Sequence, residues 1–322
     1  MKTEAHNHRD GRWGLGYLVG IPFAARRSRA AMEDMVDRRL AWLVRHAAGT
    51  MPFYNELLDA AGIDPRSVSG VRDIARLPLV GHQALREAGE RAWATDLAPR
   101  RRMLATTSGS SDEPLTLVFR FQDRLRKHLV SLHCMSMYGW RPWHRGMALG
   151  SQALPVGHGL ERFGISRWAW VDTSRPVDEW LAEYDRVRPQ ALHAYPSALR
   201  EFCFQARERG PLKWLPDILS VGGELCPDEL APLAREVFGK APLTMYGAVE
   251  GGRIAFECEA HRGLHVRADS VVIEILKDGV PAQPGEEVGE LVLPGPHPLQ
   301  GPKGLVQNPV VGPVPHLSAT TL

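Results

Sequence analysis

The sequence predicts an α/β protein, in which a helical N-terminal region precedes mixed parallel sheets with flanking helices and a small β subdomain. Three observations predict this class. Apolar residues recur at helical spacing before residue 100, short apolar runs alternate with helical stretches over 101–255, and an alternating pattern follows. A repeated succession of strand, loop and helix is typical of a sheet with helices on its faces.

Composition excludes several classes of protein. The 322 residues can bury one large core or two modest ones. The 39 basic and 37 acidic residues form no basic cluster of the kind that nucleic acid requires, and four scattered cysteines predict reduced thiols. The apolar patch at 13–25 is too short and too interrupted for a signal peptide or a membrane span. We therefore expect a cytoplasmic protein that binds neither nucleic acid nor membrane.

The first hundred residues are expected to form a helical region packed on the main domain. A helix over 29–48 is predicted because apolar side chains lie on one face: Met32, Met35, Val36, Leu40, Leu43 and Val44. A second helix over 54–61 should end at Gly62. Pro78 interrupts the helical pattern that follows.

Residues 101–255 are expected to form the α/β core. Strands are predicted within 101–111, 146–154, 191–196, 217–224 and 242–250. Helices are predicted over 122–137, 197–209 and 228–238. In such sheets ligands bind beyond the carboxyl ends of the strands, which is where the polar loops of this segment lie.

The pattern changes again after residue 255. Alternation within 263–276, a turn at Asp278-Gly279 and a strand within 287–293 predict an incomplete β subdomain over 256–293. Residues 294–322 are dense in proline and glycine and should form an irregular tail. Such a tail is what a shifted reading frame or a premature end would produce.

The first polar loop can bind phosphate. Its hydroxyls and backbone N–H groups can surround phosphate oxygens. The loop contains Thr107, Ser108, Gly109, Ser110 and Ser111. Taken alone, a Ser/Gly loop is more often just a loop, and the absence of a following Gly-Lys-Ser/Thr excludes a P-loop NTPase.

Two further loops can bind a base and a metal ion. Gly222 and Gly223 would let a flat ligand approach the backbone before Glu224, although a tight turn explains the pair equally well. The segment Tyr246-Gly247 offers a ring that could stack on a base, and Glu250 offers a carboxylate for Mg²⁺. Alone, this segment is more often a polar loop with a half-buried tyrosine.

Together, in this order and spacing, the three loops resemble the motifs of the adenylate-forming superfamily of acyl-CoA synthetases. Those motifs are Thr-Ser-Gly-Ser/Thr-Thr-Gly-x-Pro, Gly-Gly-Glu and Tyr-Gly-x-Thr-Glu. The resemblance is closest to phenylacetate–CoA ligases and their capsule-biosynthesis relatives, and runs from about Met51 to Leu293. The segments that carry it are DIARLPLVGHQALR (73–86), LHAYPSALREF (192–202) and FECEAHRGLHVRADSVVIEIL (256–276).

This resemblance implies ATP-dependent activation of a carboxylic acid, with thioester formation to CoA in complete relatives. It implies that Thr107, Ser108, Gly109, Ser110 and Ser111 hold the phosphates, the three serines being catalytic. By the same match, Gly222, Gly223 and Glu224 line the adenine site, Tyr246 with Gly247 stacks on adenine, and catalytic Glu250 holds Mg²⁺. The acid, aromatic in the nearest family, would lie near 150–159 and 194–197, and a homodimer is plausible.

Some members of this group carry a structural zinc, for which Cys258 and His265 are candidate ligands here. A structural zinc site needs four ligands, and His261 could supply only one more. We therefore favour a buried cysteine beside a strand histidine, without Zn²⁺.

The sequence departs from the family at three places. Asp112 replaces the last glycine of the first loop, and a carboxylate there repels phosphate. Val249 replaces a threonine that would contact the α-phosphate, and we expect this chain to lack the family's C-terminal lid domain with its catalytic lysine. Two alternatives to an active ligase therefore stay open: a degenerate or truncated nucleotide- or acyl-binding protein, and a non-functional gene remnant.

Overall fold

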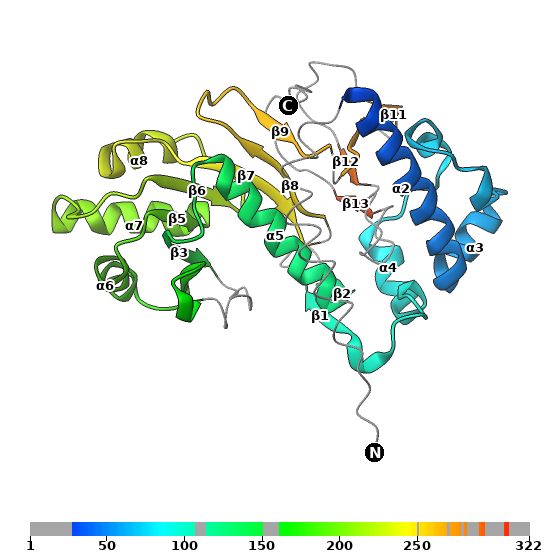
Figure 1. The fold of residues 1–322 in the computed structure, drawn as a ribbon, viewed down its shortest axis with the longest axis horizontal. Coiled ribbons are helices and arrows are strands. Elements are labelled where there is room, and N and C mark those ends of the chain that lie inside the picture. Colours follow the sequence, from blue (N-terminus) through cyan, green and yellow to red (C-terminus); the bar gives the residue numbers. More distant parts are fainter. Residues whose placement is uncertain are drawn as a thin grey trace. The chain divides into compact units, whose positions relative to one another are not determined.

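The computed structural model describes residues 28–106, 114–150, 161–249, 251–268, 271–277, 280–281, 290–293 and 306–308. These residues divide into two compact units (Figure 1). The first unit takes the described parts of 1–129, 249–254 and 266–322, and the second takes those of 130–248 and 255–265. Each unit is therefore assembled from segments that are far apart in the sequence.

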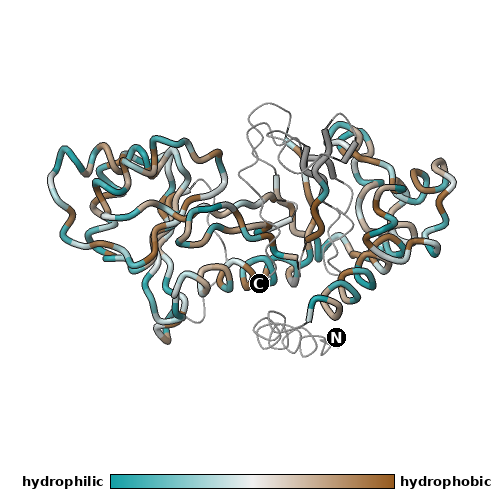
Figure 2. Tube along the Cα trace, turned by 90° about the horizontal axis from the view of Figure 1, so that it is seen from above, coloured by the Kyte–Doolittle hydropathy of each residue, from teal (hydrophilic) through white to brown (hydrophobic). Residues whose placement is uncertain are grey.

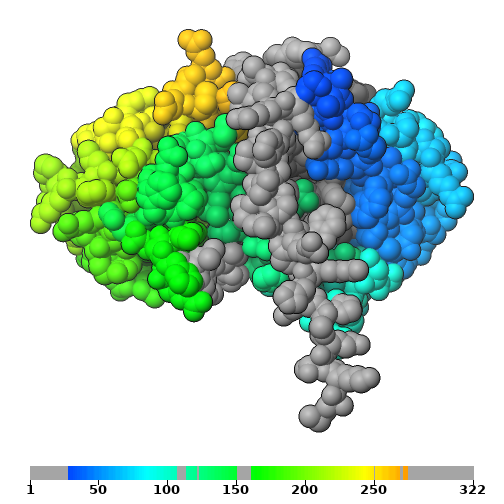
Figure 3. All heavy atoms as spheres, viewed as in Figure 1, coloured from blue at the N-terminus to red at the C-terminus, as the bar shows by residue number. Residues whose placement is uncertain are grey.

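Helices form the N-terminal part of the first unit, as their apolar spacing predicts. They include α2 (Arg29–Thr50), α3 (Pro52–Ala60), α4 (His82–Ala88), η1 (Pro65–Ser67), η2 (Val71–Arg76), η3 (Gly89–Ala92) and η4 (Pro99–Arg101). The hydroxyl of Ser28 caps α2 by accepting a hydrogen bond from Ala31 N at 3.3 Å. Pro52 begins α3, where its missing N–H costs no helical bond. Figure 3 shows α2 and α3, in blue, at the surface of this unit.

The buried faces of these helices pack with a β hairpin in one apolar core. The hairpin pairs β1 (Met103–Thr106) with β2 (Thr116–Phe119) in antiparallel register. Buried residues of this core include Leu40, Val44, Tyr54, Leu58, Ile74, Leu85, Leu117 and Phe119. The helix predicted over 29–48 thus buries the face that its apolar spacing marks.

A second sheet of the first unit is antiparallel, with strand order β11-β10-β12-β13. Its strands are β10 (Glu274–Lys277), β11 (Val280–Pro281), β12 (Glu290–Leu293) and β13 (Val306–Asn308). The predicted turn at Asp278-Gly279 lies outside the described residues, between the paired strands β10 and β11. Strand β13 corrects the expectation that 294–322 is wholly irregular. Residues 303–308 contain no proline, so their N–H groups are available to a sheet.

A seven-stranded sheet carries most of the α/β core, in the order β4-β3-β5-β6-β7-β8-β9. The strands are β3 (Arg145–Gly150), β4 (Arg167–Asp172), β5 (Ala191–Ala194), β6 (Ile218–Gly222), β7 (Leu243–Ala248), β8 (Gly252–Glu257) and β9 (Leu264–Val266). The run from β4 to β7 is parallel. All five residues of β6 are buried, as expected for a parallel sheet covered on both faces. The predicted α/β class is confirmed.

Helices and apolar clusters complete the second unit. The helices are α5 (Phe121–Met137), whose first half belongs to the first unit, α6 (Val177–Val187), α7 (Pro196–Arg209), α8 (Leu230–Phe238) and the short η5 (Glu161–Phe163). One cluster includes Met147, Leu149, Leu192, Leu199, Phe202 and Phe238, and another includes Cys134, Trp140, Ile218 and Met245. In Figure 2 the brown, hydrophobic stretches run through the interior of each unit. Within the described part of the chain, no helix is both long and apolar enough to span a bilayer.

Candidate functional site

Two of the three predicted motifs lie side by side at one edge of the seven-stranded sheet (Figure 1). Strand β6 ends at Gly222 and leads directly into Gly223 and Glu224, and Tyr246 and Gly247 lie near the carboxyl end of the neighbouring strand β7. In the parallel register Gly222 lies opposite Met245, so the two motifs follow adjacent positions. Parallel strands present their carboxyl ends at a common edge, which is where ligands of such sheets bind.

A tyrosine that follows β5 forms a wall of this edge. Tyr195 is half-buried, and a Cβ atom built on Gly223 would lie 2.7 Å from its Cε1 atom. A Cβ atom on Gly150, at the end of β3, would lie 3.5 Å from Tyr195 Cζ. Gly223 also has a φ of +89°, which a residue with a side chain adopts only under strain. Glycine is therefore required at 223 both by the backbone and by the tyrosine ring.

The side chain of Glu224 contacts a neighbouring loop. Its Oε2 atom accepts a hydrogen bond from Ser197 N at 3.0 Å, in the first turn of α7. The N-cap residue of α7 is Tyr195, whose side chain makes no capping hydrogen bond. Glu224 therefore supplies from the β6 loop the acceptor that a helix N-terminus needs.

The thiol of Cys226, two residues after Glu224, is not activated. Burial, and then the Glu257 carboxylate, raise the pKa of Cys226. A neutral thiol is a poor nucleophile. The Glu257 carboxylate is itself engaged, accepting from Thr244 N at 2.9 Å and lying 3.0 Å from His261 Nδ1. The edge thus offers binding surface and hydrogen-bond groups rather than a cysteine nucleophile.

The predicted phosphate loop and metal ligand are not described. Thr107, Ser108, Gly109, Ser110 and Ser111, together with Asp112 and Glu250, lie outside the described residues. Strand β1 ends at Thr106, immediately before that loop, and belongs to the first unit. The roles assigned to these residues stay predictions.

The residues that flank Glu250 are held by α5 within the first unit. Val249 packs its side chain against the apolar core, and its carbonyl oxygen accepts a hydrogen bond from Lys127 Nζ. The same ammonium group lies 3.9 Å from the centroid of the Phe119 ring, a cation–π contact. A Cβ atom on Gly252 would lie 3.4 Å from Lys127 Cγ. Sequence reasoning missed Lys127, which carries no motif signal.

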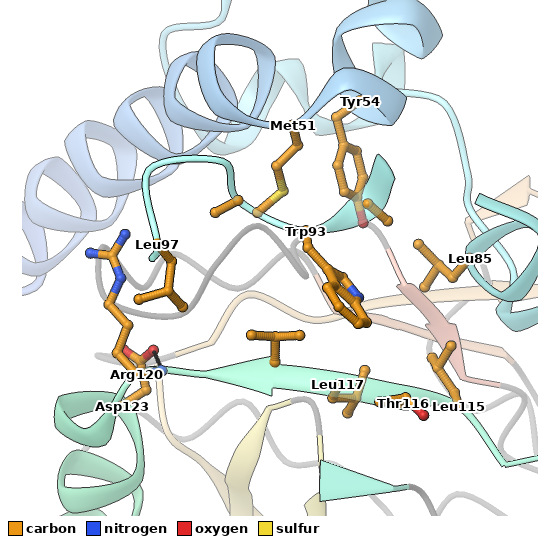
Figure 4. Close-up of a pocket in the computed structure, with 13 residues that line it drawn as sticks. Met51, Tyr54, Leu85, Trp93, Leu97, Leu115, Thr116, Leu117, Arg120 and Asp123 are labelled. Atoms are coloured by element: carbon orange, nitrogen blue, oxygen red, sulfur yellow. Dashed lines mark hydrogen bonds between the residues drawn. The ribbon is translucent and has the colours of Figure 1, made fainter. Parts of the chain in front are cut away.

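The first unit contains a small cavity, with a volume of about 60 Å³. Figure 4 shows Met51, Tyr54 and Trp93 directed into it from one side, with β2 on the other. Arg120 and Asp123 lie at one end, where Asp123 Oδ2 accepts from Arg120 N at 2.9 Å. The Arg120 guanidinium is also paired with Asp96, at 2.8 and 3.0 Å. This cavity offers mainly apolar contact, in contrast to the polar sheet edge.

The candidate zinc ligands lie in and after the last strands of the seven-stranded sheet. Cys258 follows β8, and His265 lies in β9 with its ring centroid 5.7 Å from that of Phe256. Cys258 is half-buried rather than buried, which corrects that detail of the sequence prediction. Among the described residues no group of three or more His, Cys, Asp or Glu side chains could hold a metal ion.

Comparison of sequences relates the chain to one kind of enzyme. No family model matches it. The phenylacetate–coenzyme A ligase of Thermus thermophilus is 26% identical over 283 residues, covering 82% of this chain and 62% of that ligase. The ligase of the same name from Escherichia coli is 24% identical over 282 residues, covering 81% of this chain and 62% of the ligase. The chain thus spans about 62% of the length of these curated relatives.

Comparison of structures shows the fold. An open form of 2-hydroxyisobutyryl-CoA ligase, solved with 2-HIB-AMP and CoA, matches with a TM-score of 0.72 at 19% identity, over 89% of this chain and 70% of that one. The thioesterification state of that ligase matches with a TM-score of 0.71 at 18% identity, over 92% and 69%. The chain therefore has the fold of an acyl-CoA ligase, as the motifs predict.

Proposed function

We propose, on its similarity to phenylacetate–CoA ligases, that this chain is the nucleotide-binding part of an enzyme that activates a carboxylic acid with ATP. The observation that carries the proposal is the placement of Gly222–Glu224 and Tyr246–Gly247 on adjacent strand ends. Glycines have no side chain, so they leave room beside an aromatic ring for a flat base such as adenine. In this proposal the glycine pair and Tyr246 bind adenine.

The proposed reaction has two steps. A carboxylate oxygen of the acid attacks the α-phosphorus of ATP, and the bond from that phosphorus to the bridging oxygen breaks to release pyrophosphate. The sulfur of CoA, after its proton has passed to solvent, then attacks the acyl carbon. The bond from that carbon to the oxygen on phosphorus breaks, and AMP leaves with the former carboxylate oxygen. The protein supplies no covalent nucleophile, so catalysis depends on position and on stabilised charge. Thr107 to Ser111 would donate hydrogen bonds to the phosphates.

A magnesium ion would neutralise charge on the phosphates, and Glu250 is its proposed protein ligand. Few protein ligands are needed, because Mg²⁺ keeps several waters and takes further oxygens from the phosphates themselves. Lys127 would keep the preceding carbonyl in place.

Acid-dependent exchange of labelled pyrophosphate into ATP tests the proposal, with phenylacetate and a panel of aryl acids as probes. We expect exchange by the wild type and a loss of about 100-fold in Glu250→Ala. Glu259→Ala removes an exposed carboxylate nine residues further on and should exchange within about twofold of the wild type. Equal exchange by Glu250→Ala and the wild type would remove Glu250 from the site.

A second candidate is a protein that binds nucleotide or an acyl group without turnover. Val249 favours it, because the side chain at the position of the family's threonine packs into an apolar core and offers no hydroxyl. Calorimetry separates the two functions. Binding of ATP or of an acid without exchange identifies the non-catalytic protein, and failure to bind either ATP or an acid rejects both.

A further inference from the structure

We propose that Glu224 is a positioning residue, which fixes the ring of Tyr195 against Gly223 and so shapes one wall of the nucleotide site. The effect on ATP rests on the proposed function, whereas the effect on Tyr195 does not. The role is distinct from direct contact with adenine, which the motif alone implies for Glu224.

The first support is the hydrogen bond from Ser197 N to Glu224 Oε2, at 3.0 Å. Helix α7 begins with Pro196, so Ser197 N is the first backbone donor of the helix. An acceptor at this point is normally supplied by the N-cap side chain, and a tyrosine cannot supply it. The carboxylate therefore ties the loop after β6 to the start of α7.

The second support is a further contact between the same two loops, made by the ring of Tyr195 with Gly223. The ring of Tyr195 covers the side of Gly223 from which a side chain would project, with Cε1 2.7 Å and Cδ1 3.0 Å from that position. Tyr195 is the residue immediately before α7, two positions from Ser197. A shift of the helix start would therefore move the ring directly.

The chemistry of the residue explains the choice of glutamate. A carboxylate accepts strongly from a backbone N–H and also interacts favourably with the positive end of a helix. Because Glu224 is exposed, it needs no buried partner to offset its charge. A glutamine keeps an oxygen acceptor and should retain most of the contact, whereas an alanine removes it.

The first experiment needs no nucleotide. In the wild type the Tyr195 ring current should shift the α-proton resonances of Gly223, and the Ser197 amide should exchange slowly with solvent. We expect Glu224→Ala to reduce that shift and to speed Ser197 exchange about fivefold, the loss of one ordinary hydrogen bond. Glu224→Gln should restore both. Glu208→Ala, which removes an exposed carboxylate from the other end of α7, should change neither.

The second experiment measures pyrophosphate exchange with the same variants. We expect Glu224→Ala to raise the KM for ATP several-fold while kcat stays within about twofold, with rescue by Glu224→Gln. An unchanged Gly223 shift in Glu224→Ala overturns the positioning role. A Glu224→Gln variant as defective as Glu224→Ala also overturns it, because the charge would then act directly. If no variant binds ATP, the proposed function fails while the Gly223 shift still decides the role of Glu224.

Discussion

At the scale of single residues, Gly223 combines a strained backbone with a close neighbour. Its φ of +89° and the 2.7 Å approach to Tyr195 both oppose a side chain. We expect Gly223→Ala to lower the free energy of unfolding by about 2–3 kcal/mol, as the sum of strain and overpacking. Gly239→Ala is the matched control. Gly239 has a φ of +73° with no atom within 4 Å, so it should lose only about 1 kcal/mol.

Urea denaturation of a Tyr195→Ala, Gly223→Ala double variant separates the cost of backbone strain from the cost of overpacking against the ring. In a Tyr195→Ala background the ring is gone, and Gly223→Ala should then cost about as much as Gly239→Ala. If the losses in the free energy of unfolding caused by the two single substitutions add to within about 0.5 kcal/mol in the double variant, the ring does not press on Gly223.

The pH dependence of stability contains a contribution from Asp73. Hydrogen bonds from the Ser69 hydroxyl and N–H, both 2.7 Å, and then Arg76, lower the pKa of Asp73 from 3.8 to about 2. A depressed pKa in the folded state stabilises the protein above the unfolded value, and the benefit is lost as pH falls toward 2. The urea midpoint of Asp73→Asn should therefore lie below that of the wild type at pH 5 and converge with it near pH 2. Asp185→Asn, which removes an exposed carboxylate from α6, is the control. A constant difference down to pH 2 in Asp73→Asn, or the same convergence in Asp185→Asn, would contradict this assignment.

Residue-level reasoning found the motif positions but not their partners. The glycine pair and Tyr246 were identified because motifs carry them, and the strand order then placed them together. The bond of Glu224 to Ser197 joins positions 27 residues apart and depends on how two loops meet. Such a contact leaves no periodic signal. The same is true of Lys127, whose acceptor lies 122 residues away.

At the scale of elements, α7 buries one of its faces in the core and exposes the other to solvent. Phe202 is fully buried, with its ring centroid 5.2 Å from that of Tyr184 and 5.8 Å from that of Phe238. Phe204, two positions on, is 41% exposed. We expect Phe202→Ala to lower the free energy of unfolding by about 3–5 kcal/mol and Phe204→Ala by less than about 1 kcal/mol. Comparable losses in urea denaturation would show that α7 does not pack through Phe202.

Element boundaries were predicted best where the apolar period was long. The start of α5 differs from its prediction by one residue, and that of α7 by one. Helix α6 was missed although Trp180, Leu181 and Tyr184 have helical spacing. Strand β4 was missed because most of its residues are half-buried and it carries charged residues at both ends. Strand β2 was missed because it spans four residues between a polar loop and a helix.

At the scale of the whole molecule, the two units were not predictable from local patterns. Residues 249–254 belong to the first unit although the strand before them belongs to the second. Val249 joins a core built from residues 40–119, which only long-range packing can specify. The four-part division expected from the sequence was based on changes in the hydrophobic pattern along the chain. The two units instead group segments that pack together in the folded protein.

Nucleotide binding should slow amide hydrogen exchange in some segments and leave it unchanged in others, and hydrogen exchange measured with and without ATP tests this. The contacts proposed for the adenine base lie after β5, after β6 and at the end of β7, so ATP should slow amide exchange at 195–198, 222–225 and 246–248. Helix α3 carries none of the proposed contacts and serves as the internal reference, with exchange unchanged. At 100 times its dissociation constant the ligand stabilises the bound state by about 2.7 kcal/mol, which corresponds to roughly 100-fold slower exchange where opening breaks the site. Equal slowing in α3 and in the strand ends would place the nucleotide elsewhere, because a ligand at this edge acts first on the loops that touch it.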